Sequence, residues 1–221
     1  MRRRDGHPEA QLPFLDRREA AQRLAEALLR YRGQWPLILA IPRGGAPLGR
    51  VLVDALGGDF DLVLVRKLGA PGDPELAIGA IDDTGAIHLN ATAERVGADR
   101  AYIRHEAERQ RALLERRRAL YRSDRPAVDI AGRPTIVVDD GLATGATMIA
   151  ALDAVRARRP QRLICAVPVA ARDSLDEAAR HADEVVCLAT LEPFLSVGSY
   201  YRNFDPVEDE AVVRLLAGSE A

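Results

Sequence analysis

Two adjacent aspartates, Asp139 and Asp140, stand where a short apolar run meets a loop of small residues. Residues 135–138 read Thr-Ile-Val-Val, which is typical of a buried strand, and residues 141–147 read Gly-Leu-Ala-Thr-Gly-Ala-Thr before a helical pattern. Backbone N–H groups at a helix start, together with two hydroxyls, suit a phosphate. Two carboxylates repel that phosphate, and they suit vicinal hydroxyls or a divalent cation instead. The segment therefore predicts a ligand in which a phosphate is joined to a diol, such as a phosphorylated ribose.

Other phosphate-binding loops match this chain less well. A Walker loop requires a lysine before its Ser or Thr, and Ala146 occupies that position. The glycines at residues 44–49 do not have the spacing of a dinucleotide-binding loop. The remaining alternative for residues 135–148 is a polar turn at the end of a strand.

Two further segments carry cations beside glycines. Arg43, Gly44 and Gly45 follow an apolar run, so the backbone can approach a ligand closely while the guanidinium supplies a fixed positive charge. Lys67 is the single lysine among 31 basic residues, and it follows Arg66 in a segment rich in glycine and proline. That composition predicts a mobile loop over residues 65–75. An ammonium there could offset the charge of a leaving group, although an ordinary exposed lysine is the alternative.

The C-terminal part of the chain concentrates aromatic residues. Phe194, Tyr200, Tyr201 and Phe204 lie within eleven residues of a chain that is only 5% aromatic. Aromatic faces stack on flat heterocycles, so Phe194, Tyr200 and Tyr201 are candidates for contacting a base. A cluster that caps the edge of a sheet is the alternative.

The elements that must position these residues alternate between strand and helix. Apolar runs predict strands at residues 37–41, 61–65, 135–139, 162–169 and 184–188. Helical patterns fall at about residues 17–31, 46–56, 147–158 and 174–182, the last with Ser174 as its N-cap. This order predicts an α/β fold with a doubly wound, mainly parallel five-stranded sheet.

Residues 66–133 interrupt that alternation as an insertion. Short strands at 76–81 and 86–89 flank a turn, which predicts a hairpin flap, and residues 98–121 read as one long charged helix. From residue 98 to 122 the chain has eight arginines against four acidic residues. This helix could be a dimer arm, a lid, a nucleic-acid patch or a solvated face. We predict one domain over residues 1–221, with a small C-terminal hood from about residue 189 to 221.

Composition limits the possible partners. The formal net charge of −2 argues against a polyanion binder that acts through overall charge. Cys165 and Cys187 lie in apolar runs, and the four histidines lack metal-ligand spacing. Without a signal peptide or an apolar span of membrane length, a cytoplasmic protein with no membrane partner is expected.

Residues 135–147 resemble the fingerprint of the type I phosphoribosyltransferases, which has four hydrophobic residues, two acidic residues and a small-residue loop ending in Thr-Gly. The resemblance implies binding of phosphoribosyl pyrophosphate (PRPP). Its 5′-phosphate would lie on the loop formed by Ala143, Thr144, Gly145, Ala146 and Thr147. Asp139 and Asp140 would bind the ribose hydroxyls and Mg²⁺, the metal partly through PRPP and water. Arg43, Gly44 and Gly45 would receive the pyrophosphate.

The resemblance also implies an activity. The chain would transfer the phosphoribosyl group of PRPP to a nitrogen of a small heterocyclic or amine acceptor and release pyrophosphate, with Arg66, Lys67, Asp139 and Asp140 as catalytic residues. The hypoxanthine-guanine branch carries an acidic residue where Ala143 stands, which argues against that specificity. We further expect a homodimer.

Two alternatives remain open at this point. A PRPP-binding regulator could use the same loops without transferase activity, and its arginine-rich helix could contact nucleic acid. A hydrolase or pyrophosphatase directed at phosphoribosyl groups could also use this scaffold.

Overall fold

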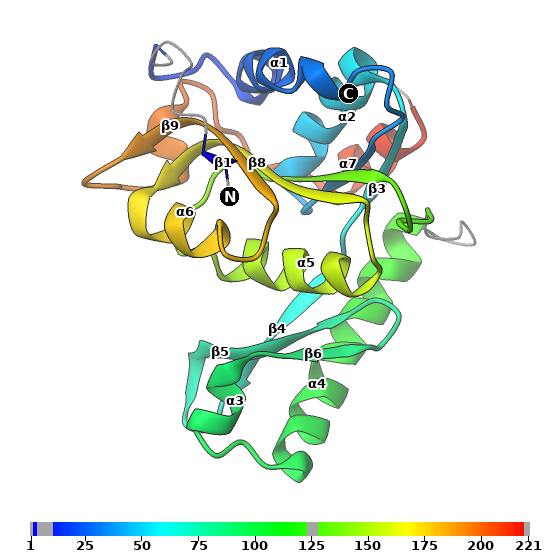
Figure 1. Ribbon diagram of the computed structural model, residues 1–221, viewed down its shortest axis with the longest axis vertical. Coiled ribbons are helices and arrows are strands. Elements are labelled where there is room, and N and C mark those ends of the chain that lie inside the picture. Colours follow the sequence, from blue (N-terminus) through cyan, green and yellow to red (C-terminus); the bar gives the residue numbers. More distant parts are fainter. Residues whose placement is uncertain (1, 4–10, 123–127, 219–221) are drawn as a thin grey trace.

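The computed structural model describes residues 2–3, 11–122 and 128–218, and these residues form two β-sheets with helices around them (Figure 1). The larger sheet has six strands, and every neighbouring pair is parallel. In spatial order the strands are β1 (Arg2–Arg3), β9 (Glu184–Leu191), β8 (Arg162–Ala171), β7 (Pro134–Val138), β2 (Leu37–Ala40) and β3 (Asp59–Leu62). The five-stranded parallel sheet predicted from the sequence is confirmed, and the two-residue strand β1 extends its edge.

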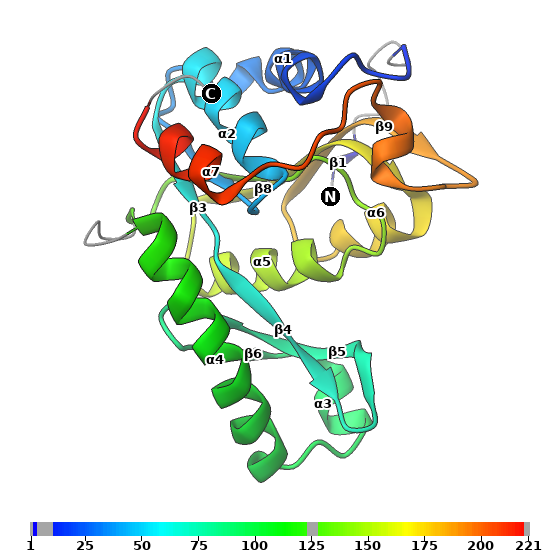
Figure 2. The same ribbon diagram turned by 180° about the vertical axis from the view of Figure 1, so that it is seen from behind.

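Helices cover both faces of this sheet because its central strands are apolar throughout. All residues of β2 and β7 are buried. On one face lie the helices α1 (Arg17–Ala27), α2 (Gly45–Leu56) and α7 (Asp209–Leu216), and on the other lie α5 (Ala146–Ala157) and α6 (Arg172–Ala178) (Figures 1 and 2). Strands buried on both sides need apolar side chains on both sides, which explains the unbroken Val, Ile and Leu runs.

The register of the sheet brings the candidate loops together. Ala40, at the end of β2, is paired with Val138, at the end of β7. The loop after each strand therefore leaves the same edge of the sheet side by side. In open α/β sheets, this carboxyl edge is where ligands bind.

The insertion forms a second body below α5, which we call the hairpin lobe (Figure 2). It contains an antiparallel three-stranded sheet with the helices α3 (Ala91–Arg95) and α4 (Arg100–Arg122). Its strands are β4 (Val65–Ala70), β5 (Asp73–Asp82) and β6 (Ile87–Leu89). The predicted hairpin and the predicted long helix are both present.

The base of the hairpin lobe is fixed by a buried charge network. Arg122, the last residue of α4, forms ion pairs with Asp61 of β3 and with Asp83 in the β5–β6 turn. It also donates to the carbonyl oxygen of Leu62 at 2.5 Å. Asp61 accepts a further hydrogen bond from the backbone N–H of Val128. One arginine thus joins the large sheet, the hairpin turn and the long helix.

Several boundaries differ from the sequence prediction. The strand predicted at 61–65 runs from Asp59 to Leu62, and Val65 begins β4 in the other sheet. The segment predicted as a mobile loop is instead part of a β-ribbon, in which β4 pairs with β5. Gly69 permits the close approach of these strands, because a Cβ atom there would lie 2.8 Å from Pro74 Cα. The predicted helix at 17–31 ends at Ala27, with a 3₁₀ turn at Leu29–Tyr31.

The C-terminal hood also departs from its prediction. It contains the 3₁₀ turn Val197–Tyr200 and the helix α7, which was not predicted. Tyr121 of α4 donates from its hydroxyl to Asp209 at 2.5 Å, so α7 is tied to the hairpin lobe. Residues 123–127 of the predicted insertion and 219–221 of the predicted hood lie outside the described residues.

Candidate active site

The loop between β7 and α5, residues 139–145, is held against β8 by its backbone. Leu142 donates to the carbonyl of Val169 and accepts from the N–H of Ala171, both at 2.9 Å. Gly145 is the N-cap of α5 with φ +77°, a left-handed conformation that favours glycine. The first N–H groups of α5 have no partners within the helix, so the loop ends in donors suited to an oxyanion.

Ser174 has a different role from the predicted N-cap. The helix α6 begins at Arg172, with Ala171 as its N-cap. The Ser174 hydroxyl donates to the carbonyl oxygen of Ala143 at 2.5 Å. This bond fixes the middle of the loop from the neighbouring helix, and it leaves the side chains of Thr144 and Thr147 exposed.

Asp139 and Asp140, here called the carboxylate pair, follow the end of β7, where burial and mutual repulsion disfavour their charged forms. Burial raises the pKa of the Asp139 carboxyl well above its ordinary value, and the adjacent Asp140 raises it further. Burial also raises the pKa of Asp140, while Arg17 opposes that shift. Two half-buried carboxylates side by side favour any partner that carries positive charge or donates hydrogen bonds.

Arg17 is the cation that meets this pair. Its Nε donates to Asp140 Oδ2 at 2.9 Å, and its Nη1 donates to the carbonyl oxygen of Asp205 at 2.7 Å. Its guanidinium lies 3.8 Å from the centre of the Phe204 ring. Arg17 is the first residue of α1, whose start is set by Asp16 accepting from the N–H of Glu19. The helix cap therefore positions a guanidinium between the carboxylate pair and the hood.

The loop after β2 packs directly on the carboxylate pair. A Cβ atom on Gly44 would overlap Asp140 Oδ2, and one on Gly45 would lie 2.6 Å from the carbonyl oxygen of Val138. These two glycines are required for close approach. The peptide bond between Pro42 and Arg43 is cis. The structure thus places the predicted pyrophosphate loop in contact with the predicted ribose-binding residues.

The side chain of Arg43 turns toward the hood. Its guanidinium lies 3.7 Å from Glu208 and 3.9 Å from Asp209, and 42% of the side chain is exposed. Exposed ion pairs of this kind contribute at most about 1 kcal/mol. A ligand phosphate can therefore compete for Arg43.

Arg66 and Lys67 lie on opposite faces of β4. Arg66 donates to Gln110 of α4 at 3.0 Å, and burial, together with nearby Arg117, lowers its pKa. Lys67 is paired with Ala80, which packs in the apolar cluster that includes α5. Residues paired across two strands share a face, so Lys67 points toward the α5 side while Arg66 points toward α4. The catalytic role of each remains a prediction.

The hood aromatics are packed on one another. Tyr201 is 6% exposed, its ring stacks on Phe204 at 5.0 Å, and its hydroxyl donates to the carbonyl oxygen of Asp140 at 2.6 Å. Stacking of a base on Tyr201 would require this cluster to open, so the geometry does not favour that prediction. Phe194 and Tyr200 are half-buried, with ring centres 5.2 Å apart, and they remain the accessible candidates.

Sequence reasoning missed Arg17 and the contact made by Ser174. Arg17 is 123 residues from Asp140, and neither its type nor its neighbours in the sequence mark it as a site residue. The signal available in the sequence was a helix that starts with two arginines, Arg17 and Arg18. Many surface helices share this feature, so it did not mark a site.

The oxygen atoms of the carboxylate pair could hold Mg²⁺ only together with oxygen atoms from a bound ligand and from water. The described residues contain no group of three or more His, Cys, Asp or Glu side chains arranged to hold a metal ion. Mg²⁺ is commonly bound by one or two carboxylates together with substrate phosphates and water. Asp139 and Asp140 supply that number of carboxylates beside two candidate phosphate sites.

Comparison with known proteins identifies the family of this fold and site. The family model described as the phosphoribosyl transferase domain matches residues 14–201. The crystal structure of TT1426 from Thermus thermophilus superposes with a TM-score of 0.90 and 43% identity, covering 95% of this chain and 100% of that one. The chain belongs to the phosphoribosyl transferase domain family, and its fold is that of the type I enzymes.

Two Mycobacterium tuberculosis proteins, provisionally named as phosphoribosyl transferases, are each 40% identical over 204 residues. Those residues are 92% of this chain and 46% of each relative, so the chain spans about half their length. Within the described residues, none of the helices combines the length and the apolar character needed to cross a membrane.

Proposed function

We propose that this protein transfers the 5-phosphoribosyl group of PRPP to a nitrogen of a small heterocyclic or amine acceptor, with release of pyrophosphate. One observation carries the proposal. The carboxylate pair lies between a loop suited to a phosphate, residues 143–147, and a glycine loop, residues 43–45, that touches it. A ligand with a phosphate at each end and a diol between them matches that order of sites.

The carboxylate pair would bind the ribose hydroxyls. Each carboxylate accepts hydrogen bonds, and the raised pKa of both groups reflects a need for donors or cations nearby. Mg²⁺, held by Asp139 and Asp140 together with PRPP and water, would supply charge neutralisation for the pyrophosphate. Arg17 would keep Asp140 in position from the other side.

Cations around the glycine loop would stabilise the leaving group. Arg43 is exposed and only weakly paired, so it can turn toward the pyrophosphate. Lys67 lies on the face of the β4–β5 ribbon that points to α5, the helix whose start would form the 5′-phosphate site. Charge placed where negative charge develops is the main contribution expected from the protein in such a displacement.

A screen of acceptors tests the proposal directly. The protein, Mg²⁺ and PRPP are incubated with a panel of nucleobases and small amines, and pyrophosphate release is measured with and without each acceptor. Acceptor-dependent release supports the transferase. Release without an acceptor supports a hydrolase, and tight PRPP binding without any release supports a PRPP-binding regulator.

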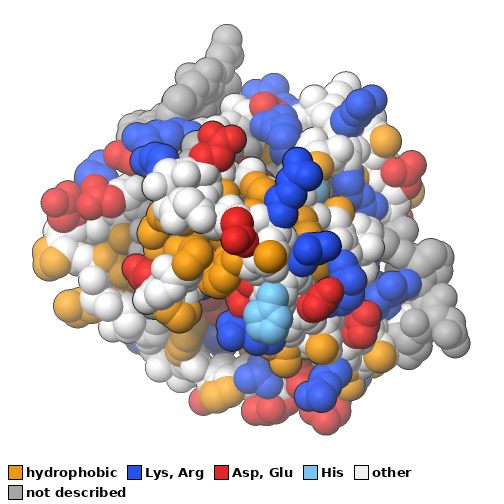
Figure 3. All heavy atoms as spheres, turned by 90° about the horizontal axis from the view of Figure 1, so that it is seen from below, with side chains coloured by type: hydrophobic (Ala, Val, Ile, Leu, Met, Phe, Trp, Pro, Cys, Tyr) orange, Lys and Arg blue, Asp and Glu red, His pale blue; other side chains and the backbone are white. Residues whose placement is uncertain are grey.

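The alternative in which the long helix binds nucleic acid has a weaker basis. Of the arginines on this helix, Arg122 is buried in the charge network and Arg109 is paired with Glu106. Figure 3 views the molecule from below, where acidic side chains lie among the basic ones. On the face that Figure 3 shows, this mixture interrupts the continuous basic surface that phosphate backbones select.

Lys67 provides a focused test of the catalytic arrangement. We expect Lys67→Ala to lower kcat by about tenfold to a hundredfold, because one charge beside a leaving group contributes about 1.4–3 kcal/mol to the transition state. Steady-state kinetics with the acceptor found in the screen measures it, and Lys67→Arg is the charge-conserving control. An unchanged kcat in Lys67→Ala would mean that Lys67 does not contribute to catalysis.

A further inference from the structure

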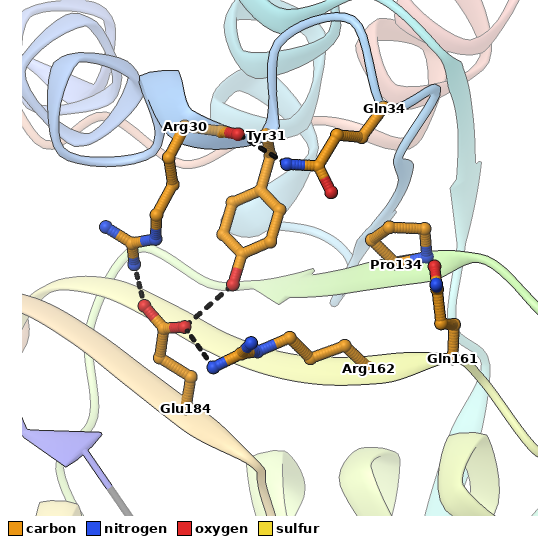
Figure 4. Close-up of a pocket in the computed structure, with 7 residues that line it drawn as sticks. All are labelled: Arg30, Tyr31, Gln34, Pro134, Gln161, Arg162 and Glu184. Carbon is orange, nitrogen blue, oxygen red and sulfur yellow. Dashed lines mark hydrogen bonds and ion pairs between the residues drawn. The ribbon is translucent and has the colours of Figure 1, made fainter.

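The amino edge of the large sheet, opposite the candidate active site, contains a cavity of about 370 Å³ (Figure 4). It lies at the starts of β7, β8 and β9 and beneath the 3₁₀ turn that follows α1. Its lining residues are almost all polar or charged: Arg30, Tyr31, Gln34, Pro134, Gln161, Arg162 and Glu184. The volume falls within the usual range of small-molecule sites.

A buried carboxylate organises this cavity. Glu184 is 7% exposed, and it is held by ion pairs with Arg30 and with Arg162, the latter at 3.1 Å. The Tyr31 hydroxyl donates to the same carboxylate at 2.7 Å. Figure 4 shows the two guanidiniums approaching Glu184 from different sides of the cavity. Their orientation is therefore fixed before any ligand arrives.

The two arginines together carry two positive charges, and the carboxylate they share neutralises one of them. Each guanidinium has five N–H donors, and the contacts with Glu184 use only part of them. About a third of the Arg30 side chain and nearly half of the Arg162 side chain are exposed. The wall thus offers a surplus of one positive charge and several oriented donors, which are the features that bind oxyanions.

The turn beside the cavity has an unusual conformation. Trp35 directly follows the lining residue Gln34, has φ +54° and precedes Pro36. A left-handed conformation is strained for a bulky residue, and the position before proline disfavours helical backbone further. The Trp35 side chain is nevertheless 63% exposed. Residues held in sparsely populated backbone conformations cluster at active sites and ligand-binding sites.

We propose that this cavity is a second ligand site, and that it binds a small molecule carrying an oxyanion between Arg30 and Arg162. The organic part of the ligand would lie against Gln34, Gln161 and Pro134. Phosphates and carboxylates share the required chemistry. The proposal does not depend on the transferase activity, because the site lies at the other edge of the sheet and shares no residue with the carboxylate pair.

Trp35 makes the test direct, because it is the only tryptophan of the chain and follows a lining residue. Its fluorescence is titrated with inorganic phosphate, AMP and malonate, with adenosine as the uncharged comparison, and each titration is repeated by calorimetry. We expect saturable changes with the anions and none with adenosine. A comparison of the affinities for AMP and malonate then shows whether the site prefers a phosphate or a carboxylate.

Two variants must shift the affinity in opposite directions. Arg162→Gln removes one guanidinium, and we expect about tenfold weaker binding. Glu184→Gln removes the competing carboxylate while keeping an acceptor for Tyr31, and we expect about tenfold tighter binding. Arg32→Gln, an exposed arginine that does not line the cavity, is the matched control and should bind as the unaltered protein does.

The outcomes separate a ligand site from a structural cluster. If Arg162→Gln and Glu184→Gln both lower the melting temperature and neither changes anion affinity, the cluster is structural and the proposal is wrong. The absence of saturable binding to the unaltered protein overturns it as well. If Glu184→Gln does not fold, Arg162→Lys decides, because a retained charge must preserve more affinity than Arg162→Gln does.

Discussion

At the carboxyl edge of the large sheet two carboxylates share one guanidinium, whereas at the amino edge one carboxylate is shared by two. Arg17 meets Asp140 beside Asp139 at the first edge. Arg30 and Arg162 meet Glu184 at the second. The first edge has a surplus of negative charge that suits hydroxyl donors and cations, and the second has a surplus of positive charge that suits oxyanions. The same kinds of side chain thus produce opposite ligand preferences, depending on their proportions.

The largest effect should come from neutralising the carboxyl edge. We expect Asp139→Asn with Asp140→Asn to weaken PRPP binding by about a hundredfold or more, since each charged hydrogen-bonding group contributes about 1.5–3 kcal/mol. Calorimetry with PRPP and Mg²⁺ measures the loss. The melting temperature should hold or rise because the mutual repulsion of two half-buried carboxylates disappears. Unchanged PRPP affinity would falsify the assignment of the ribose site.

We expect the next largest loss of PRPP affinity for Gly44→Ala. Its Cβ atom would overlap Asp140 Oδ2, so either the loop after β2 or the carboxylate must move. Overpacking of this kind costs about 1–3 kcal/mol, which corresponds to about tenfold weaker PRPP binding or more. The same calorimetric titration tests it, and far-UV circular dichroism confirms that the fold is retained. Normal affinity would show that the contact is not needed in the bound state.

Arg17→Met sharpens the comparison by leaving the carboxylate pair without its guanidinium. We expect about tenfold weaker PRPP binding, because Asp140 loses its hydrogen-bonding partner and its link to the hood. The neighbouring residue Arg18 is exposed, so Arg18→Met is the matched control. Equal affinities in the two variants would mean that Arg17 only attaches the hood to α1. Arg17→Lys should recover part of the loss.

At the amino edge, Tyr31→Phe should have the smallest effect. Glu184 loses one of three donors and keeps both arginines, so the free energy of unfolding should fall by about 1–2 kcal/mol. For a chain of this size that corresponds to a decrease in melting temperature of about 2–8 °C. Scanning calorimetry measures it, and PRPP affinity should stay unchanged. A change in PRPP affinity would mean that the two edges are coupled.

The parts of the molecule that local sequence determines were predictable. The run before Asp139 and the small residues after it specify a buried strand, a loop and a helix start within fourteen residues. The long helix and the hairpin turn likewise follow from periodicity and turn residues that are close together in the chain. The family resemblance rested on this same segment.

What depends on distant contacts was not predictable. Arg17 reaches Asp140 because the chain before α1 pairs with the hood, with Phe14 donating to the carbonyl of Tyr200. The burial of Tyr201 has the same origin. The glycines near Lys67 suggested a mobile loop, but Gly69 is needed where two strands approach closely. Composition alone does not distinguish these two uses of glycine.

The charge network at the base of the hairpin lobe has a mechanical consequence for Lys67. Arg122 clamps the end of the ribbon near Asp83 to the large sheet, while the tip at Pro71 and Gly72 is remote from that clamp. The ribbon also packs against α4 and α5 along its length. Lys67 therefore lies on a strand that is supported at its base and on its faces, and not on a free loop.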